Sequence, residues 1–211
     1  MVAQTAAKNN LIGEDVAIVE KGNHEVLPLR FLIRRIRDLE NMDIKTSNRS
    51  RRSIRLKNYN YAQADLYFIT ICTQNRRCLF GAISRDVMQL SDAGRMIEQQ
   101  WNALSMRFKK IRLDHYVVMP NHFHGIIEIL ANAQTENTIG EMVGAFKSLT
   151  TKYYINQVRQ KNWLPFNNKL WQRNYYEHVI RDEKSHLQII EYIQTNPQKW
   201  HQDAYYEVQN P

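Results

Sequence analysis

The chain has 211 residues, of which 43% are hydrophobic and 24% charged, a balance that excludes a disordered or fibrous protein and fits one sizeable folded domain. The 29 Lys and Arg residues exceed the 21 Asp and Glu residues by eight, which favours either a polyanionic partner such as nucleic acid or a basic surface kept for solubility. Two cysteines exclude a disulfide framework, and without a long apolar run or a signal-peptide pattern we expect a cytoplasmic protein with no membrane partner.

Residues 1–57 differ in composition from the rest of the chain and are predicted to be a basic N-terminal extension or linker. From Arg30 to Lys57 there are ten Lys and Arg residues against three acidic ones. Such a surplus can contact phosphates or keep a linker solvated, and we favour the linker. Within it, the apolar spacing of FLIRRIRDLENM predicts a short amphipathic helix.

Regular patterns begin at Leu66. The β-branched and aromatic run LYFITICT predicts a buried strand, and SDAGRMIEQQWNALSMRF predicts a helix that is N-capped by Ser91. The runs LDHYVVMP and HFHGIIEIL predict two strands separated by the turn residues Pro120 and Asn121, either paired as a hairpin or continuous through a kink.

Three more elements are predicted in the second half. TIGEMVGAFKSLTTKYYINQVRQ predicts a helix whose apolar stripe runs through Met142, Phe146, Leu149 and Tyr153. NYYEHVI predicts a strand, and DEKSHLQIIEYIQTNP predicts a final helix. The order βαββαβα predicts an α+β, ferredoxin-like sandwich over residues 58–200, with one additional C-terminal helix and a tail at 201–211.

Two histidines lie on one strand of this predicted sheet. His122 and His124 are two residues apart, so their side chains project to the same side, whereas Phe123 projects to the other. Two imidazoles that converge on one point can bind a metal ion, although two ordinary histidines at a strand edge give the same pattern.

The final helix offers a second pair of polar residues. Tyr192 and Asn196 are four residues apart and therefore share a helix face. A phenol and an amide oxygen at this spacing can present a nucleophile and a metal ligand to one place. The alternative is a packed tyrosine and a helix-capping asparagine before Pro197.

The segments MPNHFHGII, LWQRNYYEHVIRDEKSH and EYIQTNP occur in this order and resemble the single-tyrosine HUH transposases, most closely their REP-associated branch. The resemblance covers about Tyr59 to Trp200. It implies a metal-dependent endonuclease and strand transferase that cleaves and rejoins single-stranded DNA near hairpin-forming repeats. It also implies a phosphotyrosine intermediate, localisation at the nucleoid when DNA is bound, and in many members a homodimer.

The resemblance assigns roles residue by residue. Tyr192 becomes the nucleophile, and His122, His124 and Asn196 become the ligands of Mg²⁺ or Mn²⁺. No nucleotide cofactor is expected, because a phosphotyrosine ester keeps the bond energy needed for rejoining. Since only neutral histidines bind metal, we expect activity to fall as the pH drops through about 6.5, unless the metal lowers the pKa values of the histidines.

Several basic and aromatic residues are candidates for DNA contacts, because Lys and Arg bind phosphates and aromatic rings stack on unpaired bases. The tyrosine pairs 153–154 and 175–176 lack the Tyr-x-x-x-Asn spacing and are weaker candidates for the nucleophile. Core packing or a solvated surface is the alternative role for each DNA candidate. The candidates are Lys147, Lys152, Trp171, Gln172, Arg173, Tyr175 and Arg181.

Two rival functions fit parts of the sequence. His122, His124 and Glu128 match half of a cupin metal motif, but a cupin needs many short strands, and this chain is predicted to be helical on both sides of the strand pair. A protein of the same fold that binds hairpin or single-stranded DNA without cutting it is the stronger rival. The complete set of His122, His124, Tyr192 and Asn196 favours retained chemistry.

Overall fold

The structure, a computed structural model, describes residues 17–19, 26–28, 65–130 and 137–206. The chain divides into two units, residues 1–47 and 48–211. In the first unit, β1 (Ala17–Val19) pairs antiparallel with β2 (Val26–Pro28). The helix predicted within FLIRRIRDLENM and the basic segment after it lie outside the described residues.

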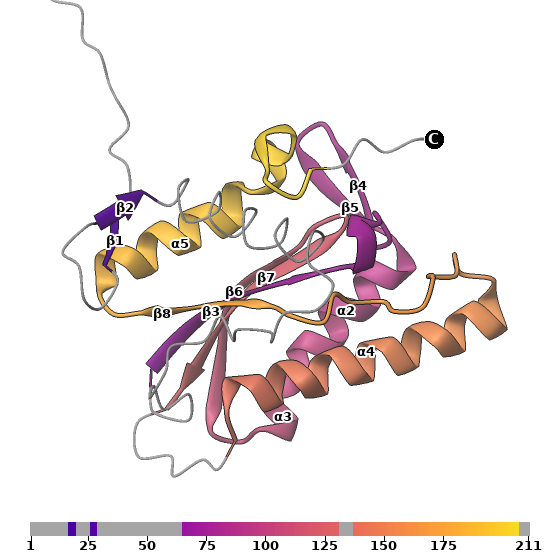
Figure 1. The fold of residues 1–211 in the computed structure, drawn as a ribbon, viewed down its shortest axis with the longest axis horizontal. Helices are drawn as coiled ribbons and strands as arrows, with labels where there is room; N and C mark the ends of the chain where they lie inside the picture. The colour runs from indigo at the N-terminus through magenta and orange to yellow at the C-terminus, as the bar shows by residue number, and fades with distance from the viewer. Residues whose placement is uncertain (1–16, 20–25, 29–64, 131–136, 207–211) are drawn as a thin grey trace, which may run out of the picture. The chain divides into compact units, whose positions relative to one another are not determined.

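A four-stranded antiparallel sheet forms the centre of the second unit (Figure 1). It consists of β3 (Asp65–Cys72), β6 (Ile111–Val118), β7 (His122–Ile129) and β8 (Tyr176–Ile180). The order in space is β6-β7-β3-β8, so the first and third of these strands along the chain are the central pair. This is the ferredoxin-like arrangement, and the predicted fold class is confirmed. The strands on either side of Pro120 form a hairpin.

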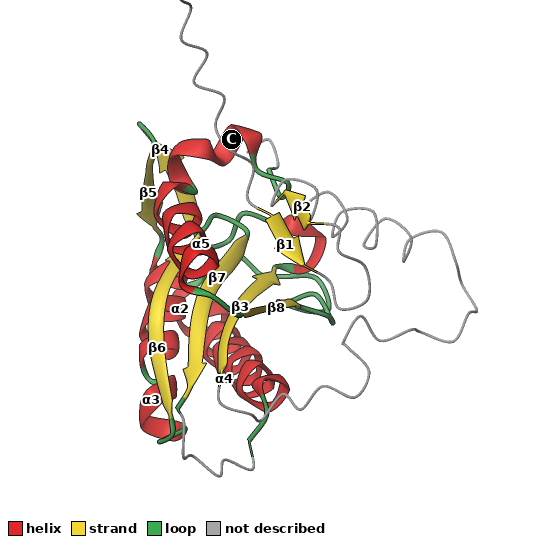
Figure 2. Ribbon diagram, turned by 90° about the vertical axis from the view of Figure 1, so that its left-hand side faces the viewer, coloured by secondary structure: helices red, strands yellow, loops and turns green. Residues whose placement is uncertain are grey.

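Helices cover both faces of the sheet. On one face lie α2 (Asp92–Asn102), followed by the short α3 (Leu104–Arg107), and α4 (Ile139–Lys161). On the other lies α5 (Glu183–Thr195), which continues into the 3₁₀ helix η2 (Pro197–Gln202). Figure 1 shows α5 above and α4 below the strands, and Figure 2 shows α5 running along the sheet.

The start of each long helix is determined by its local sequence. Ser91 Oγ accepts a hydrogen bond from Gly94 N at 3.2 Å, as the predicted N-cap of α2 requires. Thr138 and Glu141 form a capping box at α4. Asp182 Oδ1 accepts from Ser185 N at 2.8 Å at α5. These caps satisfy main-chain N–H groups that a helix leaves without partners.

Strand alternation produces two hydrophobic cores. Tyr67, Ile69 and Ile71 of β3 pack towards α2 and α4. The intervening Phe68 packs with Ile189 and other apolar residues beneath α5. The predicted stripe on α4 is wrong at its end, because Tyr154 is buried and donates to Leu164 O at 2.9 Å, whereas Tyr153 is 46% exposed.

One hairpin had no sequence signal. The strands β4 (Gly81–Ser84) and β5 (Val87–Leu90) pair through a two-residue loop, Arg85-Asp86, in which both residues have positive φ. Hairpin loops of this kind favour Asn-Gly or Asp-Gly. Arg-Asp lacks that signature, so the sequence did not predict the hairpin.

Candidate active site

The two histidines project from β7 towards α5. His122 is 0% exposed and His124 is 1% exposed, and the centroids of their rings are 4.6 Å apart. Phe123 lies on the opposite face, where its ring packs 4.6 Å from that of Trp101. The alternation expected from the sequence therefore brings two imidazoles to one buried point.

The proton on His122 is placed by Asn121. The Nδ2 group of Asn121 donates to the main-chain carbonyls of Arg76 at 3.0 Å and Tyr205 at 2.7 Å, which turns its Oδ1 towards His122 Nδ1 at 2.8 Å. An amide oxygen only accepts, so Nδ1 carries the ring proton and Nε2 keeps a free lone pair. Among the described residues, that buried Nε2 has no hydrogen-bond partner. A cation is the partner that it fits.

His124 lies between Thr70 and Tyr192. Its Nδ1 is 2.8 Å from Thr70 Oγ1, and its Nε2 is 3.3 Å from the Tyr192 hydroxyl. With Nδ1–H donating to Thr70, the Nε2 lone pair faces the phenol of Tyr192. Thr70 comes from β3, Tyr192 from α5 and His124 from β7.

Thr70 is expected to support metal binding through His124. Replacing it with Val removes the hydroxyl at nearly constant volume, and we expect the Mn²⁺ affinity to fall by about tenfold, since groups that orient a metal-binding histidine contribute about 10- to 100-fold. Thr70→Ser keeps the hydroxyl and serves as the matched control. Isothermal titration with Mn²⁺ measures both variants, and equal affinities would contradict this role.

Oxygen donors approach the histidines from the end of α5. Asn196 is 2% exposed, and its Nδ2 donates to Asp203 Oδ2 at 3.2 Å. Its Oδ1 is buried and has no hydrogen-bond partner among the described residues. Ligand atoms of His122, His124 and Asp203 lie within 4.8 Å of one another. Two nitrogens and oxygens from an amide and a carboxylate are a donor set that suits Mn²⁺ or Mg²⁺.

Sequence reasoning missed Asp203. It lies in the segment 201–211, which the sequence predicts only as a tail, and no motif links it to histidines about 80 residues earlier. The turn after η2 places it, because Asp203 Oδ1 accepts from Tyr205 N at 2.6 Å. The ring of Tyr205 lies 4.8 Å from that of His122. The only signal in the sequence was the segment Asp203-Ala204-Tyr205, which is typical of a turn closed by an aspartate side chain. Such a turn does not indicate which distant residues lie beside the aspartate.

The environment of Tyr192 holds its phenol in the neutral form. Burial raises the pKa of Tyr192 well above 10, the Asp203 carboxylate adds to the rise, and the Asn196 amide opposes it. A neutral phenol is a weak nucleophile. Without a cation beside it, Tyr192 would therefore be almost unreactive at neutral pH.

The histidines are held neutral over a wider pH range than the sequence implied. Burial lowers the pKa of His122 to about 3, with Arg76 contributing, and burial lowers the pKa of His124 well below 6.5. We therefore expect these histidines to become protonated, and activity to fall, at a pH below 6.5. The physical reason is that a buried imidazolium loses its hydration.

These shifts predict acid-sensitive folding in metal-free protein. Burial also lowers the pKa of His178, to about 4. Below about pH 6.5 the unfolded chain binds protons that the folded chain does not, so each such histidine lowers the free energy of unfolding by up to about 1.4 kcal/mol per pH unit. Thermal unfolding in EDTA should show a constant Tm above pH 7 and a falling Tm from pH 6.5 to 5.

The variant His178→Gln should make that fall less steep. His201→Gln replaces an exposed histidine and is the matched control. The same slope in all three proteins would mean that the pKa of His178 is not lowered in the folded protein.

The predicted DNA contacts divide into buried and exposed residues. Lys147 Nζ donates to the carbonyls of Gln172, Arg173 and Asn174 at 2.7, 3.1 and 3.2 Å, which leaves no ammonium hydrogen for a phosphate. Trp171 is 4% exposed, and its Nε1 donates to Thr150 Oγ1 at 2.9 Å, so its ring belongs to the core.

The remaining candidates for DNA contacts are partly buried or exposed. The hydroxyl of Tyr175 donates to Glu177 Oε2 at 2.6 Å, and its ring packs against the core beneath α4. Gln172 is partly buried. The exposed candidates are Lys152, Arg173 and Arg181.

Comparisons with known proteins show which family and which folds the chain is similar to. A family model described as "Transposase IS200 like" matches residues 63–196. An uncharacterized protein of Haemophilus influenzae is 47% identical over 174 residues, covering 74% of this chain and 93% of that protein. A second H. influenzae protein, described as a candidate REP-associated tyrosine transposase, is 24% identical over 149 residues, covering 68% of this chain and 77% of that one.

A solved structure has a similar fold. It is that of a REP-associated tyrosine transposase bound to a REP hairpin, with a TM-score of 0.50 and 19% identity. The match covers 69% of this chain and 74% of that chain. Within the described ranges, no helix is long and apolar enough to cross a membrane.

Proposed function

The chain belongs to the IS200-like transposase family, and from this premise we propose that it cleaves and rejoins single-stranded DNA near hairpins through a phosphotyrosine at Tyr192. The observation that carries the proposal is the 3.3 Å approach of the Tyr192 hydroxyl to Nε2 of His124, beside the free Nε2 of His122. A hydroxyl nucleophile next to two buried, neutral imidazoles is the arrangement that such chemistry needs.

A divalent cation, Mg²⁺ or Mn²⁺, fits the donor atoms present. His122 and His124 would hold it through Nε2, with oxygen from Asn196, Asp203 or both. When bound, the cation supplies Lewis-acid polarisation of the scissile phosphate and positive charge that favours the phenolate form of Tyr192.

The chain's own residues would carry the bond changes. The oxygen of Tyr192 attacks phosphorus, a phosphotyrosine bond forms, and the bond from phosphorus to a sugar oxygen breaks. The phenol proton passes to water and the departing sugar oxygen takes one up, so charge and protons balance. In rejoining, a new sugar hydroxyl attacks the phosphotyrosine and releases Tyr192. One phosphate ester is thereby exchanged for another, so no nucleotide cofactor is needed.

Hairpin DNA is the proposed partner. The net charge of +8 favours a polyanion, and a relative in fold was solved with a REP hairpin. Action on DNA would place the protein in the cytoplasm, at the nucleoid when bound. A homodimer remains a prediction from the family.

A denaturing gel tests the proposal. The full-length protein is incubated with Mn²⁺ and labelled oligonucleotides that carry a hairpin and a single-stranded flank. We expect label at the mass of the protein, resistant to denaturant and abolished by EDTA. If DNA is retained on a native gel but no covalent band forms with any substrate, the non-catalytic DNA-binding function replaces this one.

A further inference from the structure

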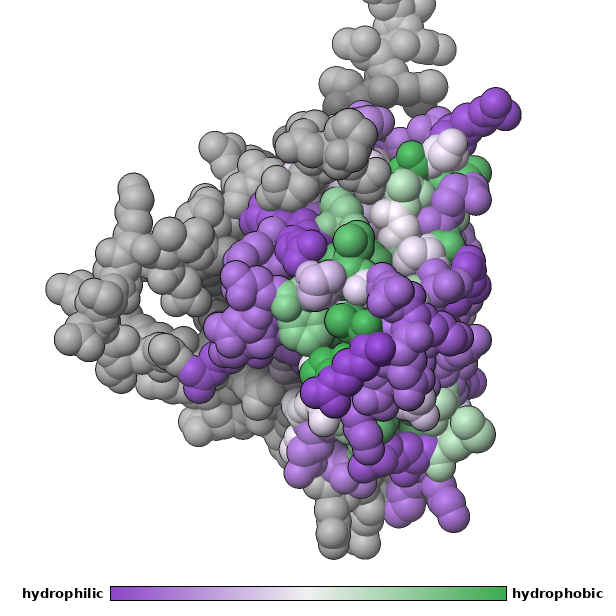
Figure 3. Space-filling model, turned by 90° about the vertical axis from the view of Figure 1, so that its right-hand side faces the viewer, coloured by the Kyte–Doolittle hydropathy of each residue, from purple (hydrophilic) through white to green (hydrophobic). Residues whose placement is uncertain are grey.

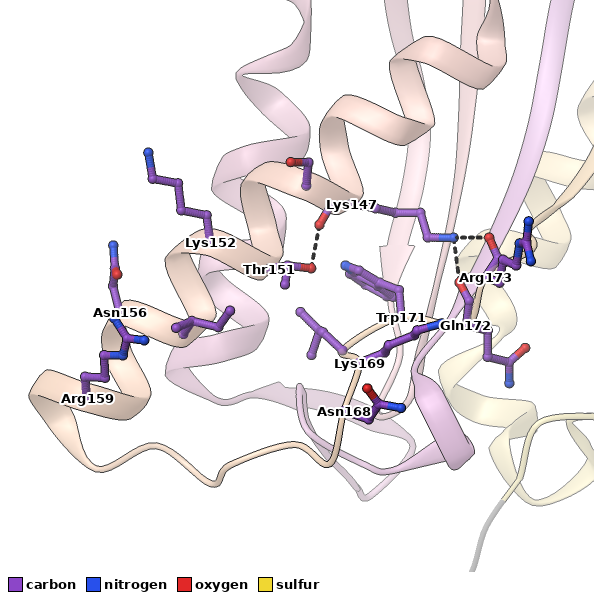
Figure 4. Close-up of a pocket in the computed structure, with 13 residues that line it drawn as sticks. Lys147, Thr151, Lys152, Asn156, Arg159, Asn168, Lys169, Trp171, Gln172 and Arg173 are labelled. Carbon is purple, nitrogen blue, oxygen red and sulfur yellow. Dashed lines mark hydrogen bonds between the residues drawn. The ribbon is translucent and has the colours of Figure 1, made fainter.

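A groove of about 630 Å³ lies between α4 and the segment 168–173 (Figure 4). Its cationic side chains include Lys152 and Arg159 from the helix and Lys169 and Arg173 from the segment. Asn156 and Thr151 add neutral hydrogen-bonding groups. Figure 3 shows the end of the molecule that faces right in Figure 1, with hydrophilic side chains around a smaller hydrophobic area.

The charge of the groove is unbalanced. Its lining, as far as the structure describes it, contains no carboxylate, and Lys152, Arg159, Lys169 and Arg173 are all exposed. Within the part of the chain that the structure describes, none of these four side chains forms an ion pair with an acidic residue. A concave surface lined only by positive charges concentrates the positive electrostatic potential and attracts a polyanion.

The wall formed by segment 168–173 is held firmly. Lys147 reaches across from α4 and donates to the carbonyls of Gln172 and Arg173 (Figure 4). At the other side of this wall, Gln172 N donates to Cys72 O at 2.9 Å, at the end of β3. The groove is therefore preformed, which lowers the entropic cost of binding.

We propose that this groove binds the sugar-phosphate backbone of the double-stranded stem of a DNA hairpin. The inference rests on the proposed function only in taking DNA as the substrate. Lysine, arginine, asparagine and threonine side chains are typical donors to phosphate oxygens. Lys147 and Trp171 take part as positioning residues, since their polar groups are used within the protein.

A duplex fits the groove better than an unpaired strand. Sites for unpaired strands present aromatic rings on which bases stack. Among the described residues that line the groove, the only aromatic ring is that of Trp171, which is 4% exposed. From Lys147 to Arg159 the helix advances about 18 Å, at about 1.5 Å per residue, which equals roughly five steps of 3.4 Å along one strand of a duplex.

The groove is separate from the catalytic residues. Helix α4 packs on the face of the sheet opposite to α5, which carries Tyr192 (Figure 1). Cys72, which anchors one wall, pairs with His122 in the sheet. A stem held in the groove would thus be fixed relative to the strand that carries the histidines.

The double variant Arg159→Gln with Lys169→Gln tests the inference. Its matched control is Arg107→Gln with Lys109→Gln, which removes the same charge from two exposed residues outside the groove. Fluorescence anisotropy measures the affinity of the Mn²⁺-loaded full chain for a labelled hairpin and for a stemless strand of equal length, from 50 to 300 mM KCl.

For the groove variant, we expect the slope of log K against log [salt] on the hairpin to become shallower by about two, because each phosphate that no longer meets a cation reduces the slope by about 0.9. The affinity at about 150 mM salt should fall by about tenfold or more, while the control and the stemless strand change by less than about threefold. An unchanged hairpin slope overturns the inference. An equal decrease on the stemless strand overturns the assignment to a duplex.

The covalent assay, run beside it, separates the two proposals. If the adduct forms but the groove variant binds as the control does, only the groove inference fails. If the groove variant loses hairpin affinity but wild-type protein forms no adduct, the inference stands and the proposed function fails.

Discussion

Replacing Tyr192 with Phe is expected to abolish the covalent protein–DNA adduct, with a loss of about 10⁴-fold or more in its rate of formation. The reason is chemical: the substitution removes only the oxygen that would bond to phosphorus. The ring keeps its position, 6.2 Å from the Phe68 ring and 5.2 Å from the His124 ring. We therefore expect hairpin affinity, measured by anisotropy, to stay within about threefold of wild type.

Tyr153→Phe is the matched control, because Tyr153 is 46% exposed and lies on α4, outside the active site. It should form the adduct at the wild-type rate. An adduct that persists in Tyr192→Phe and disappears in another tyrosine variant would assign the nucleophile elsewhere. Mass spectrometry of the labelled peptide identifies the modified tyrosine directly.

Replacing His122 with Ala is expected to remove metal binding and activity together. The free Nε2 of His122 is buried and held in one tautomer by Asn121, and the described metal-ligating cluster contains only one other imidazole, that of His124. Losing one of two imidazole ligands should weaken Mn²⁺ binding by about 100-fold or more, and adduct formation should fall below detection. Electron paramagnetic resonance of Mn²⁺ measures binding without any need for turnover.

His201→Ala, at an exposed histidine, is the control and should bind Mn²⁺ as wild type does. Circular dichroism of metal-free protein checks that His122→Ala is folded, since the variant leaves a small cavity beside Trp200 and Tyr205. A folded His122→Ala protein with wild-type Mn²⁺ affinity would show that the metal binds elsewhere.

The sequence by itself determined the fold class and the sides on which side chains lie. Alternation along β7 put His122 and His124 on one face, because strand geometry has a period of two. The caps at Ser91 and Asp182 arise from local hydrogen bonds within three residues. The sequence did not determine that Tyr154 is buried in place of Tyr153. That depends on the loop that Tyr154 contacts, where its hydroxyl donates to the carbonyl of Leu164.

Only the tertiary structure decided which distant residues complete the site. Asp203 reaches the histidines through the turn after η2, and Thr70 reaches His124 from a neighbouring strand. The sequence made Lys147 and Trp171 candidates for DNA contacts, because one is basic and the other aromatic. In the structure they instead hold the segment before β8 in place. Local patterns record periodicity and capping, which act over a few residues. Contacts between segments far apart along the chain depend on how whole elements pack, and no short pattern records that.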